Sequence, residues 1–268
     1  MLQFLEDQKT HVGFSGISTA KAALSSFITY HGKPLGQHYL VSQFMTGIAR
    51  QLPRQPKYTE IWDPDQVLKF LKTWSPAKFL NLFQLSVKTV LLLLLVSGQR
   101  VQTMTKLSLD NMMHKRRTFV FVITENLKHS RGYAPATEVT CKNFPPDARL
   151  CIENYLKAYL KRTEKLRTSR ALFVTTTKPH GAASQATLAR WVRLGLQKSG
   201  INTQKYGPAS TRAAATNKAF RQGVPIQSIL QKASWSSKTT FTTWYKKPVE
   251  KPKPMFQEAV LSMQKGKK

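Results

Sequence analysis

Apolar side chains in the first part of the chain recur at the spacing of helices. The segment after Ser18 is predicted to be a helix that Ser18 caps. Its apolar face consists of Ala20, Ala23, Leu24, Phe27 and Ile28. The breaker sequence HGKP at residues 31–34 ends it, and a second helix follows over residues 39–48. Prolines then mark a connection, so residues 1–52 are predicted to form a small helical domain and residues 53–62 a linker.

Helix and strand patterns alternate in the longer second part. Asp63 and Pro64 open a helix in the favoured order of cap and proline, and residues 76–96 predict a long buried helix. The β-branched and aromatic run TFVFVIT at residues 118–124 and the segment 137–141 predict a β-hairpin. Further elements are expected as a helix after residue 145, a strand over 171–175, a helix over 184–198, and three short helices from Ser210 that are separated at 223–225 and 235–237.

The predicted fold class is mainly α with a small antiparallel β-sheet. A larger domain is expected over residues 63–250, followed by a C-terminal tail helix within 251–268 whose apolar residues are Phe256, Val260 and Leu261. Hydrophobic residues make up 41% of the chain. This content is typical of a folded protein and excludes a disordered basic tail.

The charge of the chain indicates what kind of partner it binds. The chain has 42 Lys and Arg against 13 Asp and Glu, a net charge of +29. Acidic residues are absent between Glu164 and Glu250, where 15 Lys or Arg occur, and again from Gln8 to Thr59, where six occur. Such blocks indicate a polyanion partner, with nucleic acid favoured. A solubility surface or a ribosome-like RNA binder is the alternative, and an anionic membrane fits less well because the charges are dispersed.

Several classes of site have no sequence support. Cys141 and Cys151 are too few for a disulfide framework or a four-cysteine zinc site, and CxxC, HExxH and a Walker lysine are missing. The six histidines have no ligand spacing. The longest apolar run, residues 90–96, is far below the ~20 residues that span a bilayer. We therefore expect no metal, cofactor, membrane or small-molecule substrate, and a soluble, intracellular protein.

The remaining candidates suit phosphoryl transfer without a metal. Arg100 follows the buried helix, and Arg212 lies at a predicted helix start, so two guanidiniums can hold a phosphodiester. Lys128 lies in the hairpin turn and can protonate a leaving oxygen. Tyr245, near the end of a short helix, can attack the phosphorus and form a phosphotyrosine. Each residue alone is as consistent with a cap, a surface charge or packing.

Order and spacing strengthen the assignment, because the chain resembles the tyrosine recombinase (phage integrase) superfamily. It is most similar to the recombinases of DIRS-like and Ngaro-like retrotransposons. The matching blocks are LVSGQRVQT at 95–103, LKHSRG at 127–132, STRAA at 210–214, ILQKASWSS at 229–237 and TFTTWY at 240–245. The resemblance extends from about residue 17 to residue 260. It implies a helical, SAM-like core-binding domain before the catalytic domain, the two closing as a C-shaped clamp on double-stranded DNA.

The resemblance also implies a role for each residue. Arg100 and Arg212 correspond to the phosphate-binding arginines, Lys128 to the general acid with Arg131 as an alternative, Trp235 to the residue that supports the phosphate, and Tyr245 to the nucleophile. The lysines and arginine expected to contact DNA are Lys21, Lys33, Arg131 and Lys246. A site-specific recombinase or integrase of a mobile element is implied, acting as a homo-tetramer on DNA and located in the nucleus.

One position departs from the family pattern. The second box is His-x-x-Arg in the family, whereas Ala209 stands at the histidine position here. Its methyl group cannot bind a phosphate or accept a proton. The family usually has a further helix before the one at Ser18, so the core-binding domain is expected to be short at its N-terminus here. Both features fit a catalytically impaired, DNA-binding relic of the same fold, which is the alternative function. A monomeric type IB topoisomerase shares the residue set, and an RNA binder would form no covalent DNA adduct.

Overall fold

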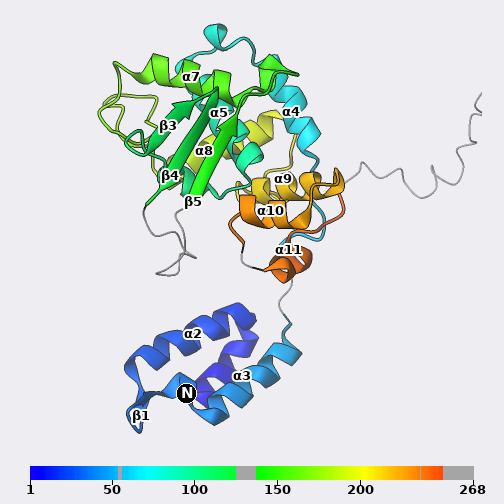
Figure 1. Cartoon of the computed structure of the whole chain (residues 1–268). Coiled ribbons are helices and arrows are strands. Elements are labelled where there is room, and N and C mark those ends of the chain that lie inside the picture. The colour runs from blue at the N-terminus through cyan, green and yellow to red at the C-terminus, as the bar shows by residue number, and fades with distance from the viewer. Residues whose placement is uncertain (54–55, 125–136, 236, 250–268) are drawn as a thin grey trace, which may run out of the picture. The chain divides into compact units, whose positions relative to one another are not determined.

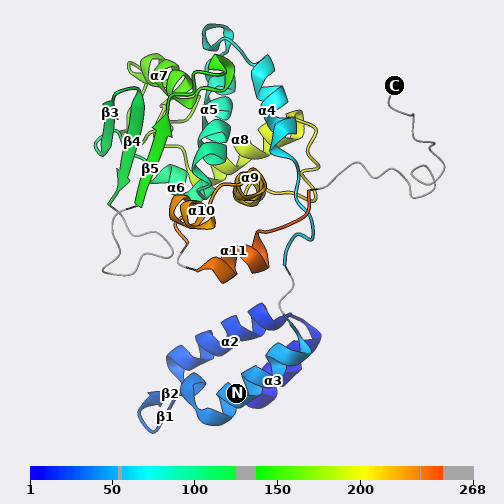
Figure 2. The same ribbon diagram turned by 45° about the vertical axis from the view of Figure 1, so that its right-hand side comes forward.

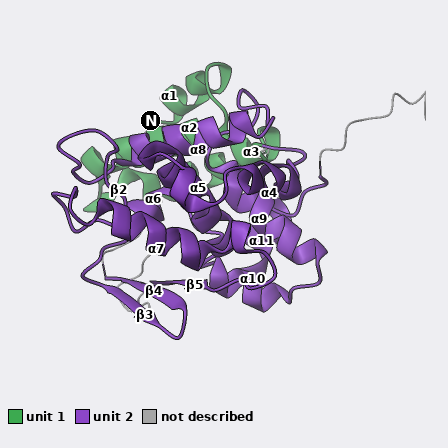
Figure 3. Ribbon diagram, turned by 90° about the horizontal axis from the view of Figure 1, so that it is seen from above, with its two compact units in different colours: residues 1–57 green, residues 58–268 purple. Residues whose placement is uncertain are grey.

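The computed structural model describes residues 1–53, 56–124, 137–235 and 237–249. The chain forms two compact units, residues 1–57 and 58–268 (Figure 3). Each unit has its own hydrophobic core. No helix in the described part of the chain is long and apolar enough to cross a membrane.

The first unit is a small helical body. Its α-helices are α1 (Leu2–Asp7), α2 (Phe14–Phe27) and α3 (Tyr39–Gln51), and the short strands β1 (Thr29–Tyr30) and β2 (Lys33–Pro34) follow α2. Five side chains form its core: Leu5, Ile17, Val41, Met45 and Ile48.

Two features of this unit differ from the sequence pattern. The prediction that Ser18 caps the helix is wrong, because α2 already begins at Phe14 after Gly13 and Ser18 lies inside it. The apolar face expected after Ser18 is wrong as well: Ile17, before Ser18, is the buried residue of α2, whereas Phe27 is 85% exposed and Ile28 lies beyond the end of the helix. α1 precedes α2 where the sequence pattern placed no separate helix, and its Leu5 is fully buried.

The second unit is built around one buried helix. Its helices are α4 (Pro64–Thr73), α5 (Leu82–Ser97), α6 (Val101–Thr105), α7 (Ile152–Thr163), α8 (Gln185–Lys198), α9 (Ser210–Arg221), α10 (Ile226–Lys232) and α11 (Lys238–Trp244). α5 packs against α7, α8 and α9. Figures 1 and 2 show α5 inside this unit, with the sheet beside it and α9, α10 and α11 gathered at one end. The candidate residues Arg212, Trp235 and Tyr245 all belong to the segments at this end.

The start of α5 was predicted wrongly. The helix begins at Leu82, not at residue 76, because Asn81 and Gln84 form a capping box in which each side chain accepts from the other residue's backbone N–H. Residues 77–79 form a separate 3₁₀ turn before it. Apolar content alone could not separate that turn from the helix.

A three-stranded antiparallel sheet lies beside α5. Its order is β3 (Met112–Lys115), β4 (Thr118–Ile123) and β5 (Thr137–Lys142). The predicted hairpin is confirmed as β4 and β5, with Phe121 opposite Val139. β3 was not predicted, since MMHK lacks the β-branched residues that mark a strand. The strand predicted over 171–175 is wrong: Ala171 and Val174 make only isolated bridges, to Ser108 and Ala182.

The remaining helix predictions are confirmed at their capped ends. Asp63 caps α4, Ser184 caps α8 and Ser237 caps α11, each accepting a backbone N–H. The helix expected after residue 145 begins only at Ile152, after a 3₁₀ turn over Ala148–Leu150. The predicted tail helix with Phe256, Val260 and Leu261 lies outside the described residues.

The start of the second unit and its last described segment lie side by side. Ile61 and Val249 form a parallel bridge, and the Ile61 N–H donates to the Pro248 carbonyl at 2.9 Å. Asn217 of α9 fastens the same exit segment by donating to the Lys247 carbonyl at 2.5 Å. The segment after Tyr245 is thus held both by the start of its own unit and by α9.

A buried lysine supports the centre of this unit. Lys88 of α5 is fully buried and donates to the carbonyls of Leu71 and Trp74 at 2.7 and 2.6 Å, where α4 ends. Its ammonium also lies 3.8 Å from the centre of the Tyr155 ring. Burial lowers the pKa of Lys88 from 10.5 to about 7. The charged form is therefore disfavoured in the folded state.

This shift predicts a pH dependence of stability. Because the folded pKa is depressed, the unfolded chain binds more protons from about pH 7 to pH 10.5, and stability rises with pH across that window. Over the first two pH units the wild type should gain about 1–2 kcal/mol of unfolding free energy relative to Lys88→Met. Urea unfolding at several pH values measures this difference. Lys69→Met, an exposed lysine of α4, should keep the wild-type slope; an unchanged slope in Lys88→Met would contradict the assignment.

Candidate functional site

Arg100 is placed by the end of the buried helix α5. Gly98 ends α5 with a φ of +62°, and a Cβ there would lie 3.3 Å from the Thr216 methyl group. Glycine is therefore required both for the left-handed turn and for the close approach to α9. The chain leaves this turn so that the half-buried Arg100 stands before α6.

Arg212 is the third residue of α9 and is only 2% exposed. The start of α9 is fixed by the Trp62 indole N–H, which donates to the buried Ser210 hydroxyl at 2.8 Å. Nη2 of Arg212 donates to the Ala233 carbonyl at 2.5 Å. The guanidinium carbon lies 4.4 Å from the centre of the Trp235 ring and 5.9 Å from that of Tyr245. Arg212 is thus the centre of the cluster.

Trp235 and Tyr245 complete this cluster from the turn before α11 and the end of α11. Their ring centres are 4.4 Å apart. The Ser237 hydroxyl caps α11, as predicted, by accepting from the Thr239 N–H. The Tyr245 N–H donates to the Phe241 carbonyl at 2.9 Å, so Tyr245 is the C-cap directly after the last residue of α11. The structure therefore brings Arg212, Trp235 and Tyr245 into mutual contact, although 33 residues separate Arg212 from Tyr245 in the sequence.

The cluster has a surplus of hydrogen-bond donors. Nε and Nη1 of Arg212 and Nε1 of Trp235 are buried and have no acceptor among the described residues. Burial, followed by the charge of Arg100, lowers the pKa of Arg212, and Tyr245 opposes this shift. Buried donors without acceptors cost about 1–3 kcal/mol each. An oxyanion placed here would satisfy the donors and offset the positive charge, so the arrangement suits a phosphate group.

A measurable consequence is that Arg212 destabilises the anion-free protein. Arg212→Met should raise the unfolding free energy by about 1–3 kcal/mol in a buffer without phosphate or sulfate. Inorganic phosphate should stabilise the wild type and leave Arg212→Met unaffected. Thermal or urea unfolding measures both effects. The control is Arg221→Met at the exposed end of α9, which should respond to phosphate as the wild type does. Destabilisation with an intact phosphate response would make Arg212 a purely structural residue.

The other predicted site residues are distributed differently. Lys128 and Arg131 lie outside the described residues. Ala209 precedes α9 with an exposed side chain, one turn before Arg212. Lys246 is exposed, with its ammonium 5.2 Å from the Phe220 ring. Lys21 and Lys33 belong to the first unit, where Lys33 is exposed and Lys21 half-buried.

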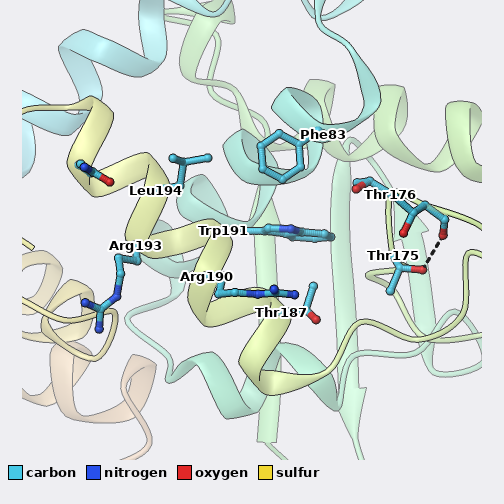
Figure 4. Close-up of a pocket in the computed structure, with 10 residues that line it drawn as sticks. Phe83, Thr175, Thr176, Thr187, Arg190, Trp191, Arg193 and Leu194 are labelled. Carbon is cyan, nitrogen blue, oxygen red and sulfur yellow. Dashed lines mark hydrogen bonds between the residues drawn. The ribbon is translucent and has the colours of Figure 1, made fainter.

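In the described part of the chain, neither a metal-binding group nor the large surface hollow coincides with the cluster. Among the described residues, no three His, Cys, Asp or Glu side chains lie together in a group that could hold a metal ion. An open hollow of about 530 Å³ lies elsewhere in the second unit, against α8, with Phe83, Arg190 and Trp191 in its wall (Figure 4). It includes none of Arg100, Arg212, Trp235 and Tyr245. The hollow is therefore separate from the candidate site.

One buried polar residue beside the cluster was given no role from the sequence. Gln99 is 3% exposed and hydrogen-bonds to the turn that carries Trp235. The sequence feature that could have indicated a role for Gln99 is its position: a long amide side chain lies between Gly98 and Arg100 at the end of an apolar helix.

The fold and the cluster together define the class of protein. The structure is mainly helical with small antiparallel sheets, as predicted, and resembles tyrosine recombinases. The family model described as "Phage integrase family" matches residues 61–251. The chain belongs to the phage integrase (tyrosine recombinase) family. Among curated protein sequences, none matches it.

Solved structures of recombinases share the fold at low sequence identity. The XerH site-specific recombinase in its pre-cleavage complex with difH substrate has a TM-score of 0.54 and 13% identity, over 94% of this chain and 71% of that one. The Tn1549 transposon integrase with circular intermediate DNA has a TM-score of 0.57 and 15% identity, over 97% and 82%. The XerA recombinase has a TM-score of 0.52 and 16% identity, over 91% and 84%.

Proposed function

We propose that this protein is a site-specific DNA recombinase that cleaves and rejoins double-stranded DNA through a 3′-phosphotyrosine. The observation that carries the proposal is the set of N–H donors on Arg212 and Trp235 that have no acceptor in the described part of the chain, in contact with the Tyr245 ring. These donors supply what a phosphodiester needs beside a tyrosine nucleophile. The structural relatives XerH and Tn1549 integrase were solved with DNA, which supports duplex DNA as the partner.

In the proposed reaction, the Tyr245 hydroxyl oxygen attacks the phosphorus and its proton passes to solvent water. A new P–O bond forms to the tyrosine, and the bond to the 5′ oxygen of the next nucleotide breaks. Arg100 and Arg212 stabilise the charge on the non-bridging oxygens, with the Trp235 indole donating a further hydrogen bond. Lys128 protonates the leaving 5′ oxygen. A 5′-hydroxyl reverses these steps, so rejoining consumes no nucleotide and no water, and the guanidiniums supply the charge without a metal.

The finer assignment rests on the sequence blocks. The spacing from SGQR at 97–100 to TTWY at 242–245 supports a mobile-element recombinase most similar to those of DIRS-like and Ngaro-like retrotransposons. Such an element would use a homo-tetramer on two DNA sites, in the nucleus. In this proposal residues 1–52 form the core-binding domain, and Lys21, Lys33, Arg131 and Lys246 contact DNA, consistent with the net charge of +29.

A second candidate function is a DNA-binding relic that has lost cleavage. Ala209 favours it, because no acid–base group occupies the position one turn before Arg212. Both candidates predict salt-sensitive binding of duplex DNA, since both neutralise backbone phosphates.

The deciding experiment uses suicide DNA substrates that carry a nick beside candidate element ends. The protein is incubated with them in a chelating buffer, and a covalent adduct is sought on a denaturing gel. An adduct whose peptide map places the DNA on Tyr245 would support the recombinase. Duplex binding without an adduct on any substrate would favour the relic, and binding of RNA in preference to duplex DNA would overturn both.

A further inference from the structure

The side chain of Gln99 connects two distant parts of the second unit. Its Nε2 donates to the Lys232 carbonyl at 2.8 Å and to the Ser234 hydroxyl at 3.1 Å. Its Oε1 faces the Thr103 hydroxyl at 3.5 Å. The buried amide thus connects the end of α5 to two residues that lie 133 and 135 positions further along the chain. It is placed immediately before Arg100 and acts on the turn that ends α10.

That turn sets the position of Trp235. Ser234 has a φ of +52°, a conformation that a serine adopts only when its surroundings hold it. The Trp235 N–H donates to the Leu230 carbonyl at 2.8 Å, and the Ala233 carbonyl accepts from Arg212. Gln99 hydrogen-bonds to the residue before Ala233 and to the residue after it, and so holds the turn on both sides. Without them, the strained backbone at Ser234 would lose its side-chain support.

We propose that Gln99 is a positioning residue for the phosphate site, acting through Lys232 and Ser234. It holds the turn so that the indole N–H of Trp235 and the free N–H groups of Arg212 serve one anion. Gln99 itself does not touch the DNA. This inference rests on the proposed function for its effect on cleavage, but its effect on Trp235 is independent of that function.

The chemistry explains why an amide is needed. The two acceptors, a carbonyl and a hydroxyl, need two N–H groups on one side chain, which glutamine supplies. Methionine has nearly the same length and shape but no donor. Gln99→Met therefore removes the hydrogen bonds with little change in packing. Ser234→Ala removes only one of the two acceptors, so its effect should be smaller.

The test uses the full chain labelled with 5-fluorotryptophan. Each of the five tryptophans gives one ¹⁹F resonance, and Trp235→Phe identifies that of Trp235. Gln99→Met should shift or broaden the Trp235 resonance and abolish its response to inorganic phosphate, while the resonances of Trp74 and Trp191 stay in place. Gln231→Met, on an exposed glutamine of α10, should match the wild type.

Cleavage supplies the second readout. At saturating DNA, Gln99→Met should form adduct up to about 100-fold more slowly, the cost of a small misplacement of the reacting groups. Its affinity for DNA should be unchanged. An unperturbed Trp235 resonance in Gln99→Met would overturn the inference, as would a shift of all tryptophans together, which would indicate a general structural role. If the wild type forms no adduct, the proposed function fails, and the ¹⁹F result still decides the role of Gln99.

Discussion

Tyr245→Phe is expected to abolish the covalent DNA adduct completely while leaving duplex affinity unchanged. The substitution removes only the hydroxyl oxygen, and the ring that packs 4.4 Å from Trp235 remains. Stability and DNA binding should therefore be retained, whereas no nucleophile is left to form the bond to phosphorus. Denaturing gels of suicide-substrate reactions measure the adduct, and filter binding or fluorescence anisotropy measures the affinity.

The control for this variant is Tyr39→Phe. Tyr39 begins α3 and is 69% exposed, so loss of its hydroxyl should leave adduct formation intact. Persistence of the adduct in Tyr245→Phe would mean that another side chain attacks the DNA. In that event the contact of Tyr245 with Trp235 and Arg212 would be packing only.

Ala209→His is expected to accelerate adduct formation by about 10²–10⁴-fold, the usual contribution of a positioned acid–base group. Ala209 lies one turn before Arg212 and its side chain is exposed, so an imidazole fits there without repacking the core. The imidazole can take the tyrosine proton or donate to the phosphate. Single-turnover rates at saturating DNA measure the gain.

Gln204→His tests whether a histidine at another nearby position also accelerates adduct formation, because residue 204 is exposed in the loop before α9. It should give no gain. The double variant Ala209→His with Tyr245→Phe should form no adduct, which ties the gain to the tyrosine. A wild-type protein with measurable activity and no gain from Ala209→His would show that another group has taken over the role; no activity in either would favour the relic.

The elements around the site were predictable where short-range signals mark them. Ser237 as a cap and the break at Gly223 and Pro225 separate α9, α10 and α11 in the sequence as they do in the structure. β3 and the true start of α5 were missed for the opposite reason. β3 is held by pairing with β4 despite weak strand propensity, and the Asn81–Gln84 capping box begins α5 beyond Pro76.

The site was predictable only as a set of residues. The family blocks point to Arg212, Trp235 and Tyr245, but the contact between them depends on how α9 packs beside the turn after α10. Gln99 lies inside the block at 95–103, but the block gives it no role, because its partners are a backbone carbonyl and a hydroxyl more than 130 residues away. Local sequence patterns hold no information on such long-range hydrogen bonds.

The bridge between Ile61 and Val249 affects how the second unit can be joined to other domains. Since residues 61 and 249 lie side by side, another domain can be attached, exchanged or inserted at this point without threading through the described part of the fold. The same geometry would allow a circular permutant, in which a short linker joins the segments at residues 61 and 249 and the chain begins and ends elsewhere. The segment that follows Tyr245 is therefore also a place where this fold can accept an added domain in its own chain.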